Sequence, residues 1–579
     1  MYRWRINSSI LEKEELLQNH LKISKVISRL LVLRGIDTVE KAEIFFSSNV
    51  SKLYSPFLMK DMEKAVQIIL KAIANHERIR IVGDYDQDGN SATVTLMKGL
   101  SRLSADVSYA IPHRIIDGYG INTEIIETAK NDHIDLIITC DNGISAFEAA
   151  DFAKHIGLKY IITDHHQVAM ENGCQILPKA DAILNPQQKD CKYPFKALCG
   201  AGVAFKLIQG LYERLDLGIE PIVDLLQFVA MGTVCDMVDI IDENRILVTE
   251  GLRRINSTTN YGLLSLIEES GWTKDIDVYA LGFVLGPAIN ASGRLDSANI
   301  AAELFLEEDR DLVKSYARQL VLLNRQRQEM TKNGETSLEK QVQCWDIEKN
   351  PVVILCAKEL HESLAGIVAG KIKEKYYRPC IVLTSSKDEG IWKGSGRSIE
   401  GYSMFDKLSE QNQYLERFGG HPMAAGLTIK EEHIGTLITA LNENHGLTRE
   451  EFIPVLNIDI PFKLKFLNEA FVQSLKVMEP FGKGNPEPVF ASKKVKLKKL
   501  QRIGKKMNVL KYIFEDDGIE IEGISFQKTD EIIERLKGKK NVQHNGNENN
   551  ESFVNIVYTP KVNTYMGKNT VQVKIKDIY

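Results

Sequence analysis

Short apolar runs alternate with amphipathic segments from about Lys60 to Leu215. The segments 91–103, 123–131 and 145–155 have helical spacing of apolar positions. The runs between them are rich in β-branched residues and read RIRIV (78–82), VSYAIP (107–112), IDLIITC (134–140) and KYIIT (159–163). Because strands that alternate with helices form βαβ units, this region predicts a parallel sheet covered by helices on both faces.

The segment 307–343 is highly charged, lacks proline and contains one glycine, Gly334. Its apolar residues Leu312, Tyr316, Leu320 and Leu323 have helical spacing. This pattern predicts a long helix that bridges two lobes, or two helices broken at Gly334.

A second α/β unit is expected from Pro351, with strands PVVILC (351–356) and PCIVLT (379–384) around a helix over 363–376. From about Pro454 the chain changes to β-rich runs separated by turns, which predicts a small barrel. The polar stretch 543–553 reads as a disordered loop inserted into it. The expected organisation is an N-terminal segment that packs on the core, a parallel-sheet domain with a helical part, a connecting helix, a second α/β domain and a barrel (1–59, 60–305, 306–345, 346–450, 454–579).

Acidic residues and histidines follow the predicted strands of the first domain. They are Asp84, Asp86 and Asp88 after the first run, Asp141 after the third, Asp164, His165 and His166 after the fourth, and Asp236 after the apolar helical segment 222–231. Ligand sites of such sheets lie outside the carboxyl ends of the strands. The pattern therefore predicts that these side chains meet at one edge of the sheet.

The stretch VGDYDQDGNSAT (82–93) places Asp84, Asp86 and Asp88 at every second position. In an extended chain these side chains point the same way, so the three carboxylates would converge and a cation would relieve their repulsion. An EF-hand is excluded, because its twelfth position is Thr95 and a strand precedes the loop. A solvated acidic turn is the plain structural alternative.

Carboxylates and imidazoles together suit Mn²⁺ or Mg²⁺, and no cluster of thiolates favours zinc. Asp141 could bridge two ions, and two ions roughly 3.5–4 Å apart could catalyse displacement at phosphorus. For His165 and His166 the structural alternative is one buried and one exposed histidine. We favour a ligand and a catalytic helper.

The 579 residues carry a net charge of −5, which identifies no partner, and the eight cysteines are scattered without a CxxC pair. This argues against a disulfide framework and a structural zinc site. No apolar run reaches membrane-spanning length and the start lacks an apolar signal block, so a cytoplasmic protein is expected. The stretch 491–511 holds nine Lys or Arg and no acid; it is a nucleic-acid strip or a hairpin with a lysine-rich outer face.

Other catalytic motifs are incomplete. The chain has no phosphate loop of an ATPase, HESLA has Ala365 where a zinc protease needs its second histidine, and GKGNPE (482–487) is no dinucleotide loop.

These residues resemble the DHH phosphoesterases, named for the motif seen here as Asp164, His165 and His166. Within that superfamily the chain is most similar to the single-strand-specific 5′→3′ DNA exonucleases, over nearly its whole length. Matching stretches are GDYDQDG, HRIIDGYG, DNGIS, TDHH, CGAGVAFKL, MGTVCDMV, GPAINASGRL, HESLAGIVAGKI, GSGRSI, FGGHPMAAGL and EPFGKGNPEP. Ser292, Cys235 and Asp239 depart from the family pattern, and none of them removes a ligand.

The resemblance implies a metal-dependent exonuclease of DNA repair and recombination that releases 5′-mononucleotides and uses two Mn²⁺ or Mg²⁺ ions. It implies a DHH catalytic domain, a DHH-associated domain and an oligonucleotide-binding (OB) barrel that binds single-stranded DNA, with a helicase or single-strand-binding protein as a candidate partner. The implied metal ligands are Asp84, Asp86, Asp88, Asp141, His165 and Asp236. His166 would act with Asp141 in catalysis, and the implied substrate contacts are Arg114, Arg294, Ser395, Arg397 and His421.

Two other functions remain open at this stage. A phosphodiesterase for short oligonucleotides or cyclic dinucleotides, or a pyrophosphatase, would need neither a DNA track nor a barrel. An inactive scaffold of a repair assembly would need no complete ligand set. For Arg114 and Arg397 the structural alternative is a salt bridge between lobes.

Overall fold

The computed structural model describes residues 2–114, 116–504, 507–526, 529–537, 552–565 and 567–579. Its contacts divide the chain into two units. The first, here the barrel unit, comprises Met1–Leu53, Asp239–Ile246 and Val455–Tyr579. The second, here the two-sheet unit, comprises Tyr54–Val238 and Leu247–Pro454. Residues 543–551 of the predicted polar insert lie outside the described residues.

The first sheet of the two-sheet unit is fully parallel, with strand order β3-β2-β4-β5-β8, as the alternating pattern predicts. Its strands are β2 (Ile79–Val82), β3 (Val107–Ala110), β4 (Leu136–Cys140), β5 (Lys159–Thr163) and β8 (Ala182–Leu184). Helices cover both faces, which explains why the central strands are apolar on both sides. In this strand order β2, β4 and β5 are neighbours. Because they run parallel, their carboxyl ends lie at the same edge of the sheet.

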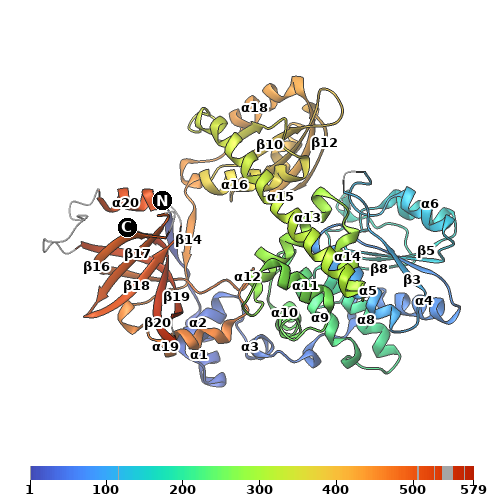
Figure 1. Ribbon diagram of the computed structural model, residues 1–579, viewed down its shortest axis with the longest axis horizontal. Helices are drawn as coiled ribbons and strands as arrows, with labels where there is room; N and C mark the ends of the chain where they lie inside the picture. The colour runs from blue at the N-terminus through green and yellow to red at the C-terminus, as the bar shows by residue number, and fades with distance from the viewer. Residues whose placement is uncertain (1, 115, 505–506, 527–528, 538–551, 566) are drawn as a thin grey trace. The chain divides into compact units, whose positions relative to one another are not determined.

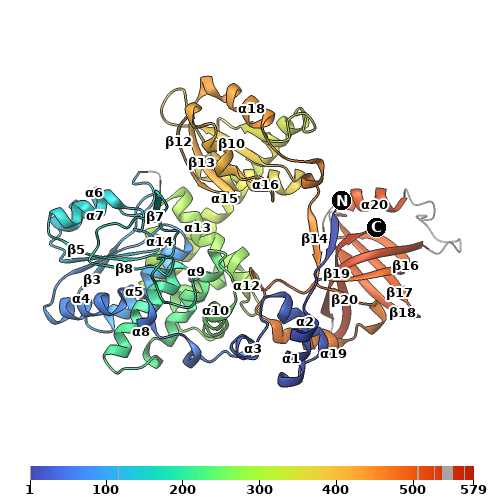
Figure 2. The same cartoon turned by 180° about the vertical axis from the view of Figure 1, so that it is seen from behind.

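Two helices pack on one face of this sheet and three on the other (Figure 1, Figure 2). The first pair is α6 (Thr123–Asn131) and α7 (Phe147–His155). The opposite group is α4 (Met62–Ala74), α5 (Gln87–Ser101) and α8 (Gly200–Arg214).

A helical region follows the first sheet. It consists of α9 (Leu226–Cys235), α10 (Asp242–Ile255), α11 (Tyr261–Ser270), α12 (Val278–Ala280), the π-helix η4 (Leu281–Leu285), α13 (Gly286–Leu295) and α14 (Asn299–Leu306). Helix α10 starts in the barrel unit and continues into the two-sheet unit.

The predicted connecting helix is α15 (Arg310–Gln343), which passes through Gly334 without a break. The alternative of two helices is therefore wrong. A mid-helix glycine costs about 1 kcal/mol, and here the helix is anchored beyond it by buried Leu338 and Val342 in an apolar cluster with the second sheet.

The second sheet has strand order β12-β13-β11-β10-β9 and is mixed, because only β9 and β10 run parallel. Its strands are β9 (Val353–Cys356), β10 (Cys380–Ser385), β11 (Ile391–Arg397), β12 (Leu415–His421) and β13 (Ala424–Lys430). Helices α16 (Ala365–Tyr376), α17 (Met404–Ser409) and α18 (Ile434–Glu443) accompany it.

The barrel unit contains the predicted C-terminal barrel, closed in the order β16-β17-β18-β20-β19 and back to β16. Its strands are β16 (Phe490–Ile503), β17 (Val509–Asp516), β18 (Ile519–Ser525), β19 (Ser552–Tyr565) and β20 (Lys568–Ile578). The apolar core of the barrel also includes residues of α1 (Leu11–Leu21), α2 (Lys25–Leu33) and α3 (Val39–Phe46). The expected N-terminal segment thus packs, through these helices, on the barrel.

Segment 239–246 joins the barrel unit through a buried arginine. The Arg245 guanidinium donates to the carbonyls of Phe45 (2.6 Å) and Met478 (3.1 Å), and it lies 3.7 Å from the centre of the Phe45 ring. Burial lowers the Arg245 pKa to about 10. Several carbonyls therefore substitute for the water that this charge loses.

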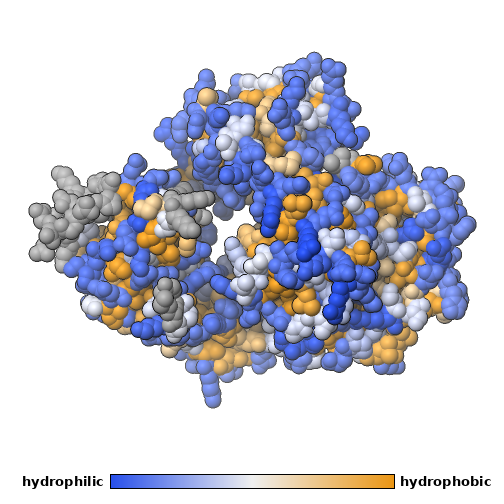
Figure 3. Space-filling model, viewed as in Figure 1, coloured by the Kyte–Doolittle hydropathy of each residue, from blue (hydrophilic) through white to orange (hydrophobic). Residues whose placement is uncertain are grey.

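The face of the two-sheet unit in Figure 3 mixes hydrophilic and hydrophobic residues and has no single continuous apolar surface. Among the described residues, no helix is long and apolar enough to cross a membrane.

Candidate active site

The carboxylates after β2 lie in a turn and the first helical turn of α5, and not on an extended chain. Asp86 is the N-cap of α5, and its Oδ1 accepts the amides of Asp88 (2.9 Å) and Gly89 (3.1 Å). The expectation of an extended chain over residues 84–88 is therefore wrong, because this cap starts the helix at Gln87. A Cβ at Gly89 would lie 2.5 Å from the Asp84 carbonyl oxygen, so the turn requires glycine.

The three carboxylates consequently divide between two groups of possible ligands. Asp84 and Asp86 lie with Asp141, whereas Asp88 lies with His165 and Asp236. A further group of possible ligands joins Asp141 to His165 and His166. Within each group the ligand atoms are all within 4.8 Å of one another. Two such groups on one sheet edge match a site for two ions better than a site for one.

Helix α8 orients Asp88 from the other side. The two Asp88 oxygens accept the amides of Gly200 (2.6 Å) and Ala201 (2.9 Å) at the start of α8. A carboxylate is stabilised at this helix end because the free amides carry partial positive charge.

Asp141 follows β4 with φ of 63°, a left-handed conformation that aspartate adopts more readily than most residues. A Cβ at Gly200 would lie 2.5 Å from the Asp141 Cβ, so this close approach requires glycine. The side-chain Nδ2 of the neighbouring Asn142 donates to the backbone carbonyls of Val82 (3.1 Å) and Cys140 (2.9 Å). These two hydrogen bonds connect the carboxyl ends of β2 and β4 next to the carboxylates.

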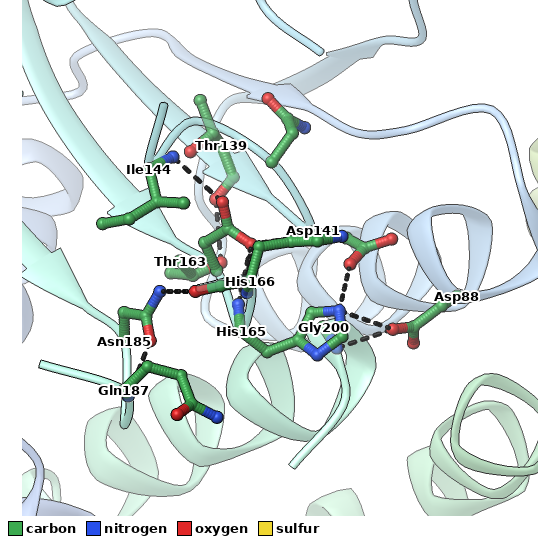
Figure 4. A network of polar contacts seen from close by, with 12 residues as sticks. Asp88, Thr139, Asp141, Ile144, Thr163, His165, His166, Asn185, Gln187 and Gly200 are labelled. Carbon is green, nitrogen blue, oxygen red and sulfur yellow. Dashed lines mark hydrogen bonds and ion pairs between the residues drawn. The ribbon is translucent and has the colours of Figure 1, made fainter. Parts of the chain in front are cut away.

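His165 lies between the carboxylates of Asp141 and Asp88 (Figure 4). Its Nε2 is 3.1 Å from Asp141 Oδ1, 3.8 Å from Asp88 Oδ2 and 3.8 Å from Asp236 Oδ2. Asp236 reaches this position as the C-cap of α9. Burial lowers the His165 pKa, which keeps the imidazole neutral and able to bind a metal.

Asp164 supports the two histidines and is not placed among the possible ligands. Its Oδ1 accepts the amides of His165 (2.7 Å) and His166 (3.1 Å) and lies 2.7 Å from His166 Nδ1, while its Oδ2 accepts the Ile144 amide. Burial lowers the His166 pKa, but the bond to Asp164 and its charge outweigh this effect and raise the pKa to about 9. The His166 side chain is 41% exposed and that of His165 12%, so His166 is the one that faces solvent.

The donor set fits divalent cations. Asp84 Oδ1, Asp141 Oδ1 and His165 Nε2 are buried, and none has a hydrogen-bond partner among the described residues. Burial, followed by the charges of nearby aspartates, raises the pKa of Asp84, Asp86 and Asp141. Ligand atoms of an octahedral ion at 2.0–2.1 Å lie about 3 Å apart, which matches the contact between Asp141 and His165.

Four of the five predicted substrate contacts line one pocket of about 820 Å³ in the two-sheet unit. They are Arg114, Arg294, Ser395 and Arg397. The start of α16 also lines this pocket, through Ala365 and Gly366.

The arginines of this pocket repel one another. Burial, followed by the charges of Arg114 and Arg327, lowers the Arg294 pKa to about 10. Burial and Arg114 also lower the Arg397 pKa. The Arg294 guanidinium also donates to the Ser363 carbonyl (2.8 Å), in the short helix that leads into α16. An anion in the pocket would relieve this repulsion.

The pocket adjoins the metal ligands through Tyr85, which stands between Asp84 and Asp86. The Arg114 guanidinium lies 4.8 Å from the centre of the Tyr85 ring. A Cβ at Gly293 would come within 2.4 Å of the Tyr85 carbonyl oxygen, so α13 packs directly on this turn.

His421 does not line the arginine pocket. It lines a neighbouring pocket of about 610 Å³ with Tyr119, Asp164 and His166. The expectation that Arg294 and His421 share one cleft therefore does not match their positions, whereas a place beside His166 suits a contact with substrate.

Sequence reasoning missed Tyr119. Its hydroxyl donates to the Asp141 carbonyl (3.0 Å) and lies 3.2 Å from both His166 ring nitrogens. Tyr119 belongs to HRIIDGYG, one of the stretches that carry the family resemblance. The sequence of this stretch did not predict the contacts of Tyr119 with Asp141 and His166. The glycines Gly200 and Gly366 were missed likewise, because a close approach cannot be read from spacing.

The described residues of the lysine-rich strip lie mainly on the paired strands β16 and β17, and part of their charge is neutralised. Lys498 pairs with Glu515 and Glu520, Arg502 with Asp530, and Lys511 with Glu522. Lys493, Lys494 and Lys499 are exposed and make no ion pair with the described residues. Both interpretations of the strip therefore retain some support.

Three family models match the chain: DHH family, N-terminal domain, over residues 78–233; DHHA1 domain over 349–445; and RecJ OB domain over 458–577. The single-stranded-DNA-specific exonuclease RecJ of Bacillus subtilis is 37% identical over 91% of this chain, which spans 66% of that relative. The RecJ of Haemophilus influenzae is 31% identical, with 96% of each chain covered.

Among solved structures, RecJ of Thermus thermophilus in complex with Mn²⁺ is similar over 100% of this chain and 79% of its own, with a TM-score of 0.82 and 26% identity. The Mg²⁺ complex of the same protein has a TM-score of 0.76 and 25% identity, over 100% and 78% of the two chains. The candidate metal-binding residues, the C-terminal barrel and the similar proteins all point to one family. The chain belongs to the RecJ family of single-stranded-DNA-specific exonucleases.

Proposed function

We propose that this protein is a metal-dependent exonuclease that degrades single-stranded DNA from the 5′ end to 5′-mononucleotides. The observation that carries the proposal is the arginine pocket beside the metal ligands, with Tyr85 between them. A terminal phosphate held there would present the next phosphodiester to the carboxylates. Such a site selects strand ends, and it explains an exonuclease better than an endonuclease.

In this proposal two Mn²⁺ or Mg²⁺ ions are held by six side chains, those of Asp84, Asp86, Asp88, Asp141, His165 and Asp236. When bound, the ions would activate a water and stabilise the departing oxygen. Asp141 belongs to two of the possible ligand groups, which suits a bridging position. Asp88 and Asp141 are held in place by α8 and Tyr119, so the ligands need little rearrangement.

His166 is protonated near neutral pH, because Asp164 raises its pKa. In the proposed reaction water attacks the second phosphate, the bond to the 3′ oxygen of the first nucleotide breaks, and a proton passes to that oxygen. His166 is positioned to contact this phosphate or to assist the leaving group. The shortened strand keeps a 5′ phosphate, so each product presents the same end to Arg114, Arg294, Ser395 and Arg397.

The barrel unit favours this function over the small-substrate alternatives. A pyrophosphatase or cyclic-dinucleotide phosphodiesterase has no use for an OB barrel, whereas a long strand can follow exposed Lys493, Lys494 and Lys499 by its backbone. We also propose a cytoplasmic location, a role in DNA repair and recombination, and a helicase or single-strand-binding protein as partner.

Time-resolved digestion of single-stranded DNA labelled at either end, with Mn²⁺ or Mg²⁺, tests the function. We expect early mononucleotides from the 5′ end, lost in Asp141→Ala but kept in the surface control Asp151→Ala. Hydrolysis of dinucleotides or pyrophosphate alone would support the small-substrate enzyme. A wild-type protein that binds DNA but cleaves none of these would support the scaffold.

A further inference from the structure

Three aromatic rings form a row on the surface of the two-sheet unit, and we call this row the aromatic ladder. The ring centres of Trp272 and Tyr279 are 6.2 Å apart, and those of Tyr279 and Phe283 are 5.0 Å apart with 23° between their planes. Tyr279 is 58% exposed and Phe283 70% exposed. Large rings usually lie in cores or interfaces, so an exposed row of them indicates a binding surface.

The backbone under the ladder is a π-helix. Tyr279 lies on α12 and Phe283 on η4, and the helix continues without interruption into α13. Wide turns of this kind are rare and occur frequently at functional sites.

One end of this helix packs against the segment that supplies a metal ligand. Cys235 Sγ lies 3.6 Å from the Leu281 carbonyl oxygen, and a Cβ at Gly286 would come within 2.3 Å of that sulfur. Cys235 directly precedes Asp236, and the next residue, Met237, is 68% exposed. The ladder therefore begins beside the metal centre.

The other end of the same helix lies at the arginine pocket. Asn290 Oδ1 accepts the Gln87 amide (2.7 Å) at the start of α5, and Arg294 lines the pocket. At 1.5 Å per residue, Phe283 and Arg294 are roughly 16 Å apart along the axis. The continuous helix of α12, η4 and α13 (Figure 1) thus carries Arg294 of the arginine pocket near one end and Tyr279 and Phe283 of the ladder near the other.

We propose that the aromatic ladder is a stacking platform for bases of the single strand on the 3′ side of the scissile phosphate. The inference rests on the proposed function, which places the 5′ phosphate at the opposite end of this helix. Every base has a π face, so stacking would hold the strand without reading its sequence.

The surroundings of the ladder favour stacking over charge. Asp275 and Asp277 lie in the same segment, with Lys274 as the nearest cation in sequence. Asp277 Oδ1 accepts the Ala280 amide as the N-cap of α12. A surface with these acids would attract few phosphates, and it leaves the ring faces as the contact with nucleic acid.

The test compares the full-length wild type with the double variant Tyr279→Ala/Phe283→Ala. Affinity for a 5′-phosphorylated oligothymidylate of about 12 nucleotides, measured in chelator, should fall about 10- to 100-fold. The slope of affinity against salt should not change, because no phosphate contact is lost. Hydrolysis of a 5′-phosphorylated dinucleotide should be unchanged, because this substrate extends only to the metal centre and does not reach the ladder.

A conservative pair separates stacking from apolar docking. Phe283→Tyr should retain affinity for the long strand, whereas Phe283→Leu should lose it although it stays apolar. In wild type, 2-aminopurine placed at successive positions should be quenched a few nucleotides from the 5′ end, and the double variant should lose this quenching.

Equal affinity of wild type and double variant for the long strand would overturn the inference and leave the proposed function intact. Retained affinity in Phe283→Leu would also overturn it and indicate a protein-docking surface. If wild type cleaves neither the dinucleotide nor the long strand, the proposed function fails instead. Thermal melting of each variant checks folding, and Phe283→Leu supplies the measurement if the double variant does not fold.

Discussion

His166 Nδ1 lies 2.7 Å from Asp164 Oδ1, and the same oxygen accepts the backbone amides of both histidines. One buried carboxylate therefore sets both the position and the protonation of His166. Asp164 differs in this from the other acids of the sheet edge, whose oxygens include buried atoms without hydrogen-bond partners among the described residues.

Asp164→Asn should lower kcat about 100-fold or more, because the His166 imidazolium loses its counter-charge. With the His166 pKa near 9, activity should decline as the pH rises through that value, and this alkaline limb should move to lower pH in the variant. Initial rates against pH provide the measurement. Asp181→Asn is the matched control, since Asp181 accepts a backbone amide near the other end of β5; an unshifted limb would remove the role given to Asp164.

The metal-free protein should lose stability as the pH rises. Burial and neighbouring aspartates raise the Asp141 pKa above its unfolded value of 3.8. The protonated form therefore stabilises the folded state at low pH, and this stability is lost as the pH rises through the folded pKa. Asp141→Asn removes the titration, so in chelator its melting temperature should exceed that of wild type by an increasing amount as the pH rises above about 4.

Divalent metal should reverse this order. Mn²⁺ should raise the melting temperature of wild type and affect Asp141→Asn much less, because a ligand that binds only the folded state stabilises it. Parallel melting curves for the two proteins in chelator at all pH values would contradict the burial of charge at Asp141.

Gly366→Ala should weaken recognition of the terminal phosphate. The added Cβ would lie 2.5 Å from Arg397 Nη2 and 2.8 Å from Ser395 Oγ, so both side chains would have to move. Gly370→Ala on the same helix is the matched control, because its Cβ would meet nothing within 4 Å. We expect the preference for 5′-phosphate over 5′-hydroxyl strands to fall about tenfold only at position 366. Equal effects at both positions would indicate a change in α16 itself.

Arg397→Ala should reduce affinity for 5′-phosphorylated strands about 10- to 100-fold, as expected for the loss of hydrogen bonds to a charged group. Arg397→Lys should restore little, because the pocket uses the planar fork that Ser395 orients at 2.9 Å. Competition binding of phosphorylated and hydroxyl-ended strands measures this preference. Arg318→Ala, an exposed arginine paired with Glu269, is the control; unchanged preference in Arg397→Ala would contradict the role of Arg397.

The sequence by itself determined the elements and the sheet edge that bears the acids. β-Branched runs and helical spacing depend on local side-chain preferences, so β2, β4, β5 and α6 lie close to their predicted bounds. A parallel sheet aligns its carboxyl ends, so residues that follow neighbouring strands must meet there. The carboxylates of Asp84 and Asp141 could therefore be placed at one edge of the sheet from the sequence alone.

Only the tertiary structure decided how these groups divide and what surrounds them. Arg114 lies in a loop, Arg294 on α13 and Arg397 on β11, and spacing along the chain does not show that they line one pocket. The contacts of Tyr119 with Asp141 and His166 likewise depend on where a loop packs. The physical reason is that local sequence sets dihedral preferences and periodicity, whereas contacts between distant segments arise from packing and burial of whole elements.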